Sequence, residues 1–476
     1  MAKNICIFSD GTGQAGGVRP DQRLSNVYKI YRAARIDPTN DIDPTEQVCF
    51  YDPGLGTDDD VRSGFTGIRR GLGKLLSSAT GRGITHNIVD CYEAILNLYE
   101  PGDRIYLLGF SRGAYTARCV ANVVSLCGIP TTDGNDDPLP KNTSRCRAIA
   151  HEAVAKVYEF GAGRALRTHF AARQELGRRF RTRYNSGDDE GSNVYPYFVG
   201  VFDTVASLGS KGIVRLLISA FLISLALLAI AVTAWLATWL IPLHFWGLFA
   251  IFGLLTLLFA GWKTFGSSFK RIADFPSKGK SLWHFAKWRM KNYDRGLSTR
   301  VGYTRHAIAI DETRADFPRV KWGYKQLDYT RDENIEPFVQ LWFAGNHSDI
   351  GGSYPETESR LSDIALKWMV DEARSLPKPL QVDASKLHIF PSAAGMQHCE
   401  VESVRDSYPA WWPKKFRKSW SEATRKAVLG APVHSSVHER FALPSIHKCG
   451  AMHAYRPEAL REDERFKHYY ADTSID

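Results

Sequence analysis

The sequence has few cysteines, and this limits the kinds of site that it can build. Its 476 residues include eight cysteines and no C-x-x-C pair, so neither a disulfide framework nor a zinc site is indicated. Several cysteines lie in apolar runs such as residues 4–8, and we expect all of them to be reduced core residues. No internal repeat, metal motif or cofactor motif is present, and we expect no metal and no cofactor. The first residues run straight into an apolar strand, so no signal peptide is expected.

A second absence concerns charge. No Asp, Glu, Lys or Arg occurs between Leu216 and Ala260. A transmembrane helix needs about 20 apolar residues, so this stretch is long enough for two spans. Pro242 marks the expected turn between them. We therefore predict a transmembrane helical hairpin over residues 211–262.

Basic residues flank this hairpin, whereas its tip has none. Lys211 and Arg215 precede it, and residues 263–300 hold ten Lys or Arg with interleaved aromatic residues. Because cytoplasmic loops carry an excess of Lys and Arg, both flanks are predicted to be cytoplasmic. Much of the net charge of +10 lies in this segment. It suits an anionic membrane lipid as partner, and no nucleic-acid motif accompanies it, so no nucleic acid is expected. A solvated charged face is the alternative.

Outside the hairpin, short apolar strands alternate with helical patterns. Continuous apolar strands in such an alternation are typical of a mostly parallel sheet that helices cover on both faces. Polar residues follow the strands, at the edge where open α/β sheets place their active sites. The strands are expected at residues 5–8, 48–51, 105–108, 197–202 and 339–343, with a helix at 84–99.

The most informative strand end is the pentapeptide Gly109-Phe110-Ser111-Arg112-Gly113. G-x-S-x-G between a strand and a helix is the nucleophile elbow of α/β-hydrolases. Its tight turn would present the Ser111 hydroxyl at the carboxyl edge of the sheet. The backbone N–H of Arg112, at a helix N-terminus, would face the substrate oxyanion. A chance match in a βα unit is the alternative.

A serine nucleophile needs a base and an orienting acid, which α/β-hydrolases carry in the order Ser, acid, His. Asp203 and His347 each follow a predicted strand in that order. Ser111 is predicted to attack, His347 to transfer the proton and Asp203 to orient the imidazole. Asp349 is a rival acid, or a brace for the His347 loop. Asp203 could instead cap a helix, and His347 could be a solvated loop residue.

Five segments, taken together, resemble one family. They are similar to the bacterial and fungal α/β-hydrolase domain family that includes the first family of type VI secretion lipase effectors, which are phospholipases. The resemblance covers about residues 1–210 and 300–360. The segments are IFSDGTG at 7–13, YDPGLGT at 51–57, GFSRGAYTAR at 109–118, GVFDTVASLG at 200–209 and WFAGNHSDIGGSY at 342–354.

The resemblance implies roles for residues of these segments. Ser111, Asp203 and His347 take the places of nucleophile, acid and base. The turn at Asp10 borders the site, with Gly11 or Thr12 as a further oxyanion donor. This chain differs from the secreted effectors in the integral hairpin between its acid and its base.

These features predict an α/β-hydrolase-like fold, with a mostly parallel sheet covered by helices and an inserted transmembrane hairpin. The expected activity is that of a membrane-anchored serine hydrolase, a lipase or phospholipase, in a bacterial inner membrane with its catalytic domain in the cytoplasm. An esterase or thioesterase on a soluble acyl substrate, or a catalytically silent membrane scaffold, is the alternative. The expected units are a first hydrolase part (1–210), the hairpin (211–262), a basic aromatic juxtamembrane segment (263–300), a second hydrolase part with the histidine (301–400) and a C-terminal helical and loop region packed on the hydrolase domain (401–476).

Overall fold

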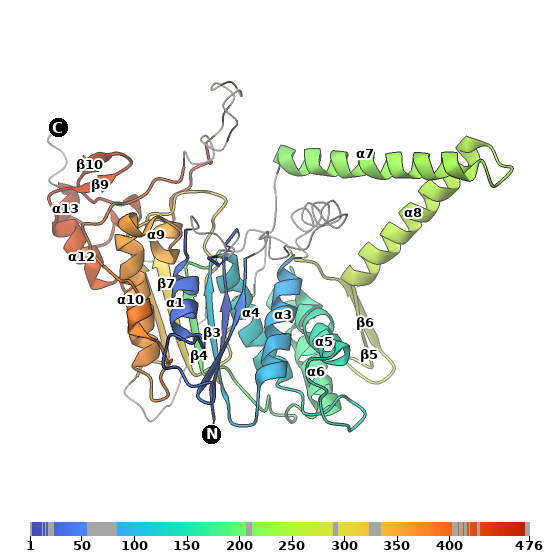
Figure 1. The fold of residues 1–476 in the computed structure, drawn as a ribbon, viewed down its shortest axis with the longest axis horizontal. Helices are drawn as coiled ribbons and strands as arrows, with labels where there is room; N and C mark the ends of the chain where they lie inside the picture. Colours follow the sequence, from blue (N-terminus) through green and yellow to red (C-terminus); the bar gives the residue numbers. More distant parts are fainter. Residues whose placement is uncertain are drawn as a thin grey trace.

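A six-stranded parallel sheet forms the centre of the protein (Figure 1). The computed structural model describes residues 2–11, 13–14, 16–17, 23–54, 83–205, 212–288, 294–322, 335–401, 408, 413, 417, 419–425 and 429–471. In the sheet the strand order is β2-β1-β3-β4-β7-β8, and every neighbouring pair is parallel. The predicted α/β class with a parallel sheet is therefore confirmed. The strands are β1 (Asn4–Ser9), β2 (Gln47–Asp52), β3 (Arg104–Phe110), β4 (Phe198–Phe202), β7 (Tyr303–Ala309) and β8 (Phe338–Phe343).

Helices cover both faces of the sheet because its strands are apolar on both sides. Successive side chains of a strand point to opposite faces. On β1, Ile5 and Ile7 pack with the core of α3 (Gly83–Leu98) and α4 (Arg112–Cys127). Cys6 and Phe8 pack with the core of α1 (Asn26–Ala34) and α10 (Arg360–Arg374).

Further elements lie beside these two layers. α5 (Ser144–His151), a π-helical turn (Glu152–Val157), a 3-10 turn (Tyr158–Gly161) and α6 (Leu166–Tyr184) pack near α3 and α4 (Figure 1). The C-terminal region forms its own small core against β7 and β8. Its elements are α12 (Ser435–Ala442), β9 (Ile446–Lys448), β10 (Ala451–His453) and α13 (His468–Ala471).

The strand order creates a topological switch point between β1 and β3. Open α/β sheets bind ligands in the crevice outside the carboxyl ends of the strands at such a point. Ser9, the last residue of β1, pairs with Gly109 near the end of β3. The predicted elbow therefore lies at this switch point.

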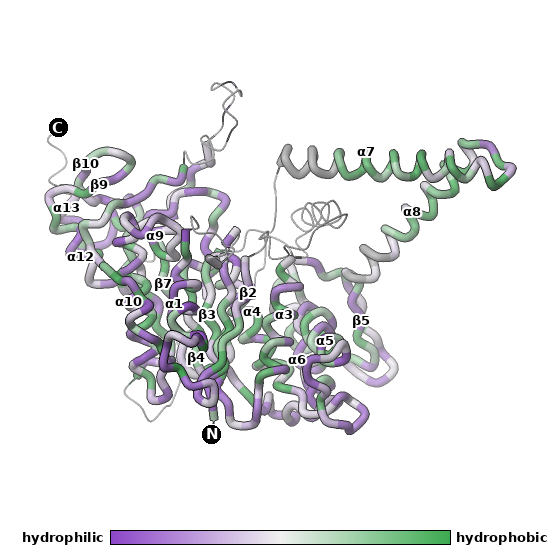
Figure 2. Tube along the Cα trace, in the orientation of Figure 1, coloured by the Kyte–Doolittle hydropathy of each residue, from purple (hydrophilic) through white to green (hydrophobic). Residues whose placement is uncertain are grey.

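Two long apolar helices project from the domain as a hairpin. They are α7 (Gly212–Ala237) and α8 (Phe245–Ser268), and they leave on the side of the carboxyl ends of the strands (Figure 1). Most of their described length is hydrophobic (Figure 2). The windows Ala220–Ala237 and Phe245–Trp262 have mean hydropathies of 2.4 and 1.9 and are each only 6% buried. By length and composition both helices can cross a membrane, and the rest of the protein does not cover their apolar side chains.

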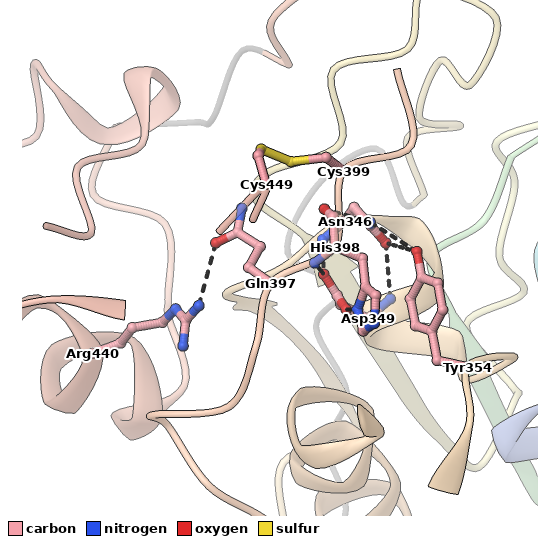
Figure 3. The surroundings of a disulfide bond; sticks show 8 residues. All are labelled: Asn346, Asp349, Tyr354, Gln397, His398, Cys399, Arg440 and Cys449. Atoms are coloured by element: carbon pink, nitrogen blue, oxygen red, sulfur yellow. Dashed lines mark hydrogen bonds and ion pairs between the residues drawn. A yellow bond between two sulfur atoms is a disulfide. The ribbon is translucent and has the colours of Figure 1, made fainter. Parts of the chain in front are cut away.

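A disulfide joins Cys399 to Cys449 (Figure 3). The expectation that all cysteines are reduced was therefore wrong for these two. The other six are free, and all but the half-buried Cys49 are buried. The two bonded cysteines lie 50 positions apart, and only the folding of the C-terminal region brings them together. Spacing in the sequence does not reveal such a pair.

Candidate active site

Ser111 occupies a strained turn between β3 and α4. Its backbone has φ 59° and ψ −120°, a conformation that non-glycine residues rarely adopt and that is concentrated at functional sites. The flanking glycines allow this turn to pack tightly. A Cβ atom on Gly113 would lie 2.0 Å from the carbonyl oxygen of Ser9, and one on Gly109 would lie 2.5 Å from that of Gly113. Local geometry therefore requires the G-x-S-x-G spacing.

The structure brings the three predicted residues into one hydrogen-bonded array, the Ser-His-Asp array. His347 Nε2 lies 2.8 Å from Ser111 Oγ, and His347 Nδ1 lies 2.6 Å from Asp203 Oδ2. All three side chains are buried, with Asp203 completely so. When Nδ1–H donates to the carboxylate, Nε2 is left with a lone pair to accept the serine proton. Phe110 stacks on the His347 ring and fixes its plane.

Asp203 follows β4 and is held by donors on all sides. Its Oδ1 accepts a hydrogen bond from the backbone N–H of Ala309 at 3.0 Å. Arg425 makes a two-pronged ion pair with it, Nη1 to Oδ1 at 2.5 Å and Nη2 to Oδ2 at 2.9 Å. Burial by itself would raise the pKa of Asp203, but the charge of Arg425 and the hydrogen bond with His347 hold that pKa well below its usual value. The carboxyl is therefore ionised.

Asp349, the rival acid, does not contact the imidazole of His347. It closes a capping box with Asn346 at the start of α9 (His347–Gly351). Its Oδ2 accepts the Asn346 N–H at 3.0 Å, and its Oδ1 lies 2.7 Å from His398 Nδ1 (Figure 3). Burial raises the pKa of Asp349, although His398 acts in the opposite direction. Asp349 therefore braces the short helix that carries His347.

The turn after β1 borders the nucleophile. A Cβ atom on Gly11 would lie 3.2 Å from the Cβ of Ser111. The Gly11 N–H donates to Asp10 Oδ1 at 2.7 Å, so in this structure the amide is engaged by its neighbour. Burial raises the pKa of Asp10 to about 6, against the hydrogen bonds that it accepts. Thr12 lies outside the described residues.

Arg112 begins helix α4 immediately after the nucleophile. The first backbone N–H groups of a helix have no partner within the helix, and the helix dipole makes that end electropositive. Burial lowers the pKa of the Arg112 side chain to about 10, which leaves it charged at neutral pH. Among the described residues, no group of three or more His, Cys, Asp or Glu could hold a metal ion.

A parallel sheet that helices cover on both faces, with a polar site at its topological switch point, places the protein in the α/β class. A family comparison identifies the particular group. The chain belongs to the family of type VI secretion system phospholipase effectors that are like Tle1, whose catalytic-domain model matches residues 3–233 and 241–372. This confirms the resemblance found in the sequence and places the protein in a family of lipolytic hydrolases.

Individual relatives are more distant. The uncharacterized protein YEL023C of Saccharomyces cerevisiae is 29% identical over 212 residues, which are 44% of this chain and 27% of the yeast protein. A crystal structure of an uncharacterized Pseudomonas aeruginosa protein is 17% identical with a TM-score of 0.36, covering 82% of this chain and 48% of that one. The Tle1 effector bound to the VgrG spike is 19% identical with a TM-score of 0.29, covering 76% and 53%. The chain thus spans about half of each solved structure and about a quarter of the yeast relative.

Proposed function

We propose that the protein is a membrane-anchored serine hydrolase that cleaves carboxylic esters of bilayer phospholipids. The observation that carries the proposal is the Ser-His-Asp array, in which His347 Nε2 lies 2.8 Å from the Ser111 hydroxyl. Membership of a phospholipase effector family supports the lipid substrate. The long apolar helices α7 and α8 support the membrane anchor.

The array gives a complete sequence of proton and bond changes. His347 Nε2 takes the hydroxyl proton of Ser111 while Ser111 Oγ attacks the ester carbonyl. The imidazolium then returns this proton to the leaving alcohol, and an acyl-serine remains. Water, deprotonated by His347, attacks the acyl-serine, and Ser111 recovers its proton as the fatty acid leaves. Asp203 stays ionised throughout and stabilises the imidazolium.

The negative charge that forms on the carbonyl oxygen needs hydrogen-bond donors. The N–H of Arg112, at the start of α4, is our proposed donor, because it adjoins the nucleophile at an electropositive helix end. Gly11 is the proposed second donor. To donate to the oxyanion, the Gly11 N–H must turn away from Asp10 Oδ1 and toward the substrate.

The proposed lipid contact centres on the small hairpin that follows α8. It consists of β5 (Phe269–Ala273) and β6 (Ser281–Phe285). Phe269 and Trp283 are 44% and 48% exposed, and the guanidinium of Arg271 lies 4.4 Å from the Trp283 ring. Exposed aromatic and cationic side chains next to apolar helices suit the interface of an anionic bilayer. Trp288 differs, because its Nε1 donates to the buried Glu159.

Two signals about the side of the membrane disagree. The basic residues that flank the helical hairpin of α7 and α8 favour a cytoplasmic catalytic domain. The Cys399–Cys449 disulfide, by contrast, is typical of an oxidising compartment. We propose the cytoplasmic side. The flanking charges set the orientation during insertion, whereas this cysteine pair, kept reduced in the cytoplasm, can be oxidised to the disulfide once the protein leaves that compartment.

A fluorophosphonate probe tests the nucleophile directly, since it reacts with an activated serine only. We expect the full-length protein in detergent to be labelled at Ser111, and the Ser111→Ala variant not to be labelled. Ser125→Ala, in helix α4 directly after the Ser111 turn, is the matched control and should be labelled like the wild type. Wild-type protein that stays unlabelled while folded would instead support a silent scaffold.

A further inference from the structure

We propose that Arg425 is a positioning residue for the active site, and that the C-terminal region is thereby part of the catalytic apparatus. The inference rests on the proposed function above. Arg425 lies beyond residue 372, where the family match ends. It is 8% exposed, and its guanidinium reaches the acid of the Ser-His-Asp array.

The geometry of the pair makes use of both the charge and the fork shape of a guanidinium. Two N–H groups of Arg425 meet the two carboxylate oxygens of Asp203, which is the bidentate arrangement that Arg prefers. The same guanidinium donates to the carbonyl oxygens of Ala309 at 3.3 Å and Phe317 at 3.0 Å. These anchors on separate segments fix its plane, and through it the plane of the carboxylate.

Asp203 consequently has a full set of partners. Oδ1 accepts from Ala309 and Arg425, and Oδ2 accepts from His347 and Arg425. Without Arg425, this buried carboxylate would have no cationic partner while His347 is neutral, so it would be harder to keep ionised. It would also be freer to rotate. Arg425 holds Oδ2 toward Nδ1 of the imidazole, so that Nε2 faces Ser111.

Strand-like pairing between residues 313–315 and 421–423 holds Arg425 in this position. Ala423 donates its N–H to the carbonyl of Thr313 at 2.7 Å, and the N–H of Ala315 donates to Ser421 at 2.8 Å. Glu312 directly precedes Thr313 in this pairing, and its carboxylate accepts the backbone N–H of His347 at 3.2 Å. One local pairing therefore links the arginine with the loop of the catalytic histidine.

A double-mutant cycle with Asp203 separates positioning from a general structural role. The proteins are the wild type, Arg425→Met, Asp203→Asn and the double variant, each full-length in detergent, with a water-soluble p-nitrophenyl ester as substrate. We expect Arg425→Met to lower kcat by on the order of 10- to 100-fold, as loss of an outer-shell partner does at metal sites, with KM changed less than about twofold. In the Asp203→Asn background the same substitution should cost almost nothing further, because its target is already neutral.

Two further variants complete the test. Arg425→Lys retains the cation and should recover part of the lost kcat; it also carries the test if Arg425→Met does not fold. Arg440→Met is the matched control, because Arg440 is fully buried in the same C-terminal region and donates to the Gly395 carbonyl and to the Gln397 side chain (Figure 3 shows the latter), not to a member of the Ser-His-Asp array. It should lower the melting temperature and leave kcat close to the wild-type value.

The inference would be overturned by wild-type kcat in Arg425→Met, by an equal loss in both backgrounds, or by Arg425→Lys performing no better than Arg425→Met. Failure of the proposed function has a different signature. In that case the wild type would hydrolyse the ester no faster than Ser111→Ala.

Discussion

Ser111 Oγ and His347 Nε2 lie 2.8 Å apart although 236 positions separate them in the sequence. The apolar helices α7 and α8 lie between them, after Asp203 and before the histidine. The chain therefore leaves the site after the acid, passes through the hairpin and returns with the base. The proposed anchor and the proposed catalytic groups therefore both follow strand ends at the carboxyl edge of the sheet, where α7 and α8 leave the domain (Figure 1).

The two candidate acids should differ sharply in their effect on catalysis. Asp203→Asn removes the carboxylate that accepts from Nδ1, so we expect kcat to fall by on the order of 10³- to 10⁴-fold. Asp349→Asn disturbs the cap of α9 and should mainly lower stability, by about 1 kcal/mol. Ester hydrolysis and thermal unfolding of both variants check this. If Asp349→Asn were the more damaging for kcat, Asp203 would not be the orienting acid.

Asp52 should make the folded protein less stable as the pH rises toward neutrality. Burial raises the pKa of Asp52 to about 7, against hydrogen bonds from Ser9 and Asn87. Between the unfolded value near 4 and this value, the native state binds more protons than the unfolded state, so the free energy of unfolding falls with rising pH. Asp203 contributes in the opposite sense, but only below about pH 4, because its pKa is lowered.

Denaturant titrations of Asp52→Asn between pH 4 and pH 7.5 measure this effect. The variant should lose less stability than the wild type across that window. Parallel pH dependences for the two proteins would show that Asp52 does not titrate there.

The oxidation state of Cys399 and Cys449 in intact cells should report the side of the membrane. A cytoplasmic catalytic domain predicts that both are free thiols, because that compartment keeps cysteines reduced. Alkylation of cells, followed by mass spectrometry of the two peptides, measures this. A disulfide already present in cells would place the catalytic domain on the opposite side. In the purified protein, formation of the bond should add about 2–4 kcal/mol to the free energy of unfolding.

The hairpin should keep the enzyme at its substrate. Replacing residues 213–262 with a short Gly/Ser linker should give a soluble protein that still cleaves short esters, because the Ser-His-Asp array lies in the α/β domain. Its activity on vesicle phospholipid should fall. A shortened protein that hydrolyses vesicle lipid at the full rate would leave the hairpin with a role in location alone.

The topology of that hairpin has its own measurement. A reporter fused near Leu243 should map to the side opposite the catalytic domain, since a single span, α7 or α8, separates this position from each flank. A reporter signal on the same side of the membrane as the catalytic domain would contradict insertion as a hairpin.

The elbow was predictable from the sequence because its determinants are local. The glycines at 109 and 113, the apolar strand before them and the helix after them are neighbours in the chain. Strand β7 was missed for the opposite reason. Its Arg305 and His306 interrupt the apolar pattern that marks a buried strand, yet both are buried. Arg305 pairs with Glu372 on α10 and donates to the backbone carbonyl of Glu336, and both of these partners are remote in sequence.

Arg425 and the disulfide were missed because the residues near them in the sequence form no recognisable motif. Arg425 stands in a basic, irregular stretch where a solvated arginine is the ordinary expectation. Its contact with Asp203 spans 222 positions, and that of Cys399 with Cys449 spans 50. Both depend on how the C-terminal region folds back onto the sheet.

The most direct measurement of the central claim is fatty-acid release from phospholipid vesicles by the reconstituted full-length protein. The wild type and the Ser125→Ala control should release fatty acid at comparable rates. Ser111→Ala and His347→Ala should each lose at least about 10³-fold, because members of such an array act as a unit. Release by either of these two variants within about tenfold of the wild-type rate would contradict the account.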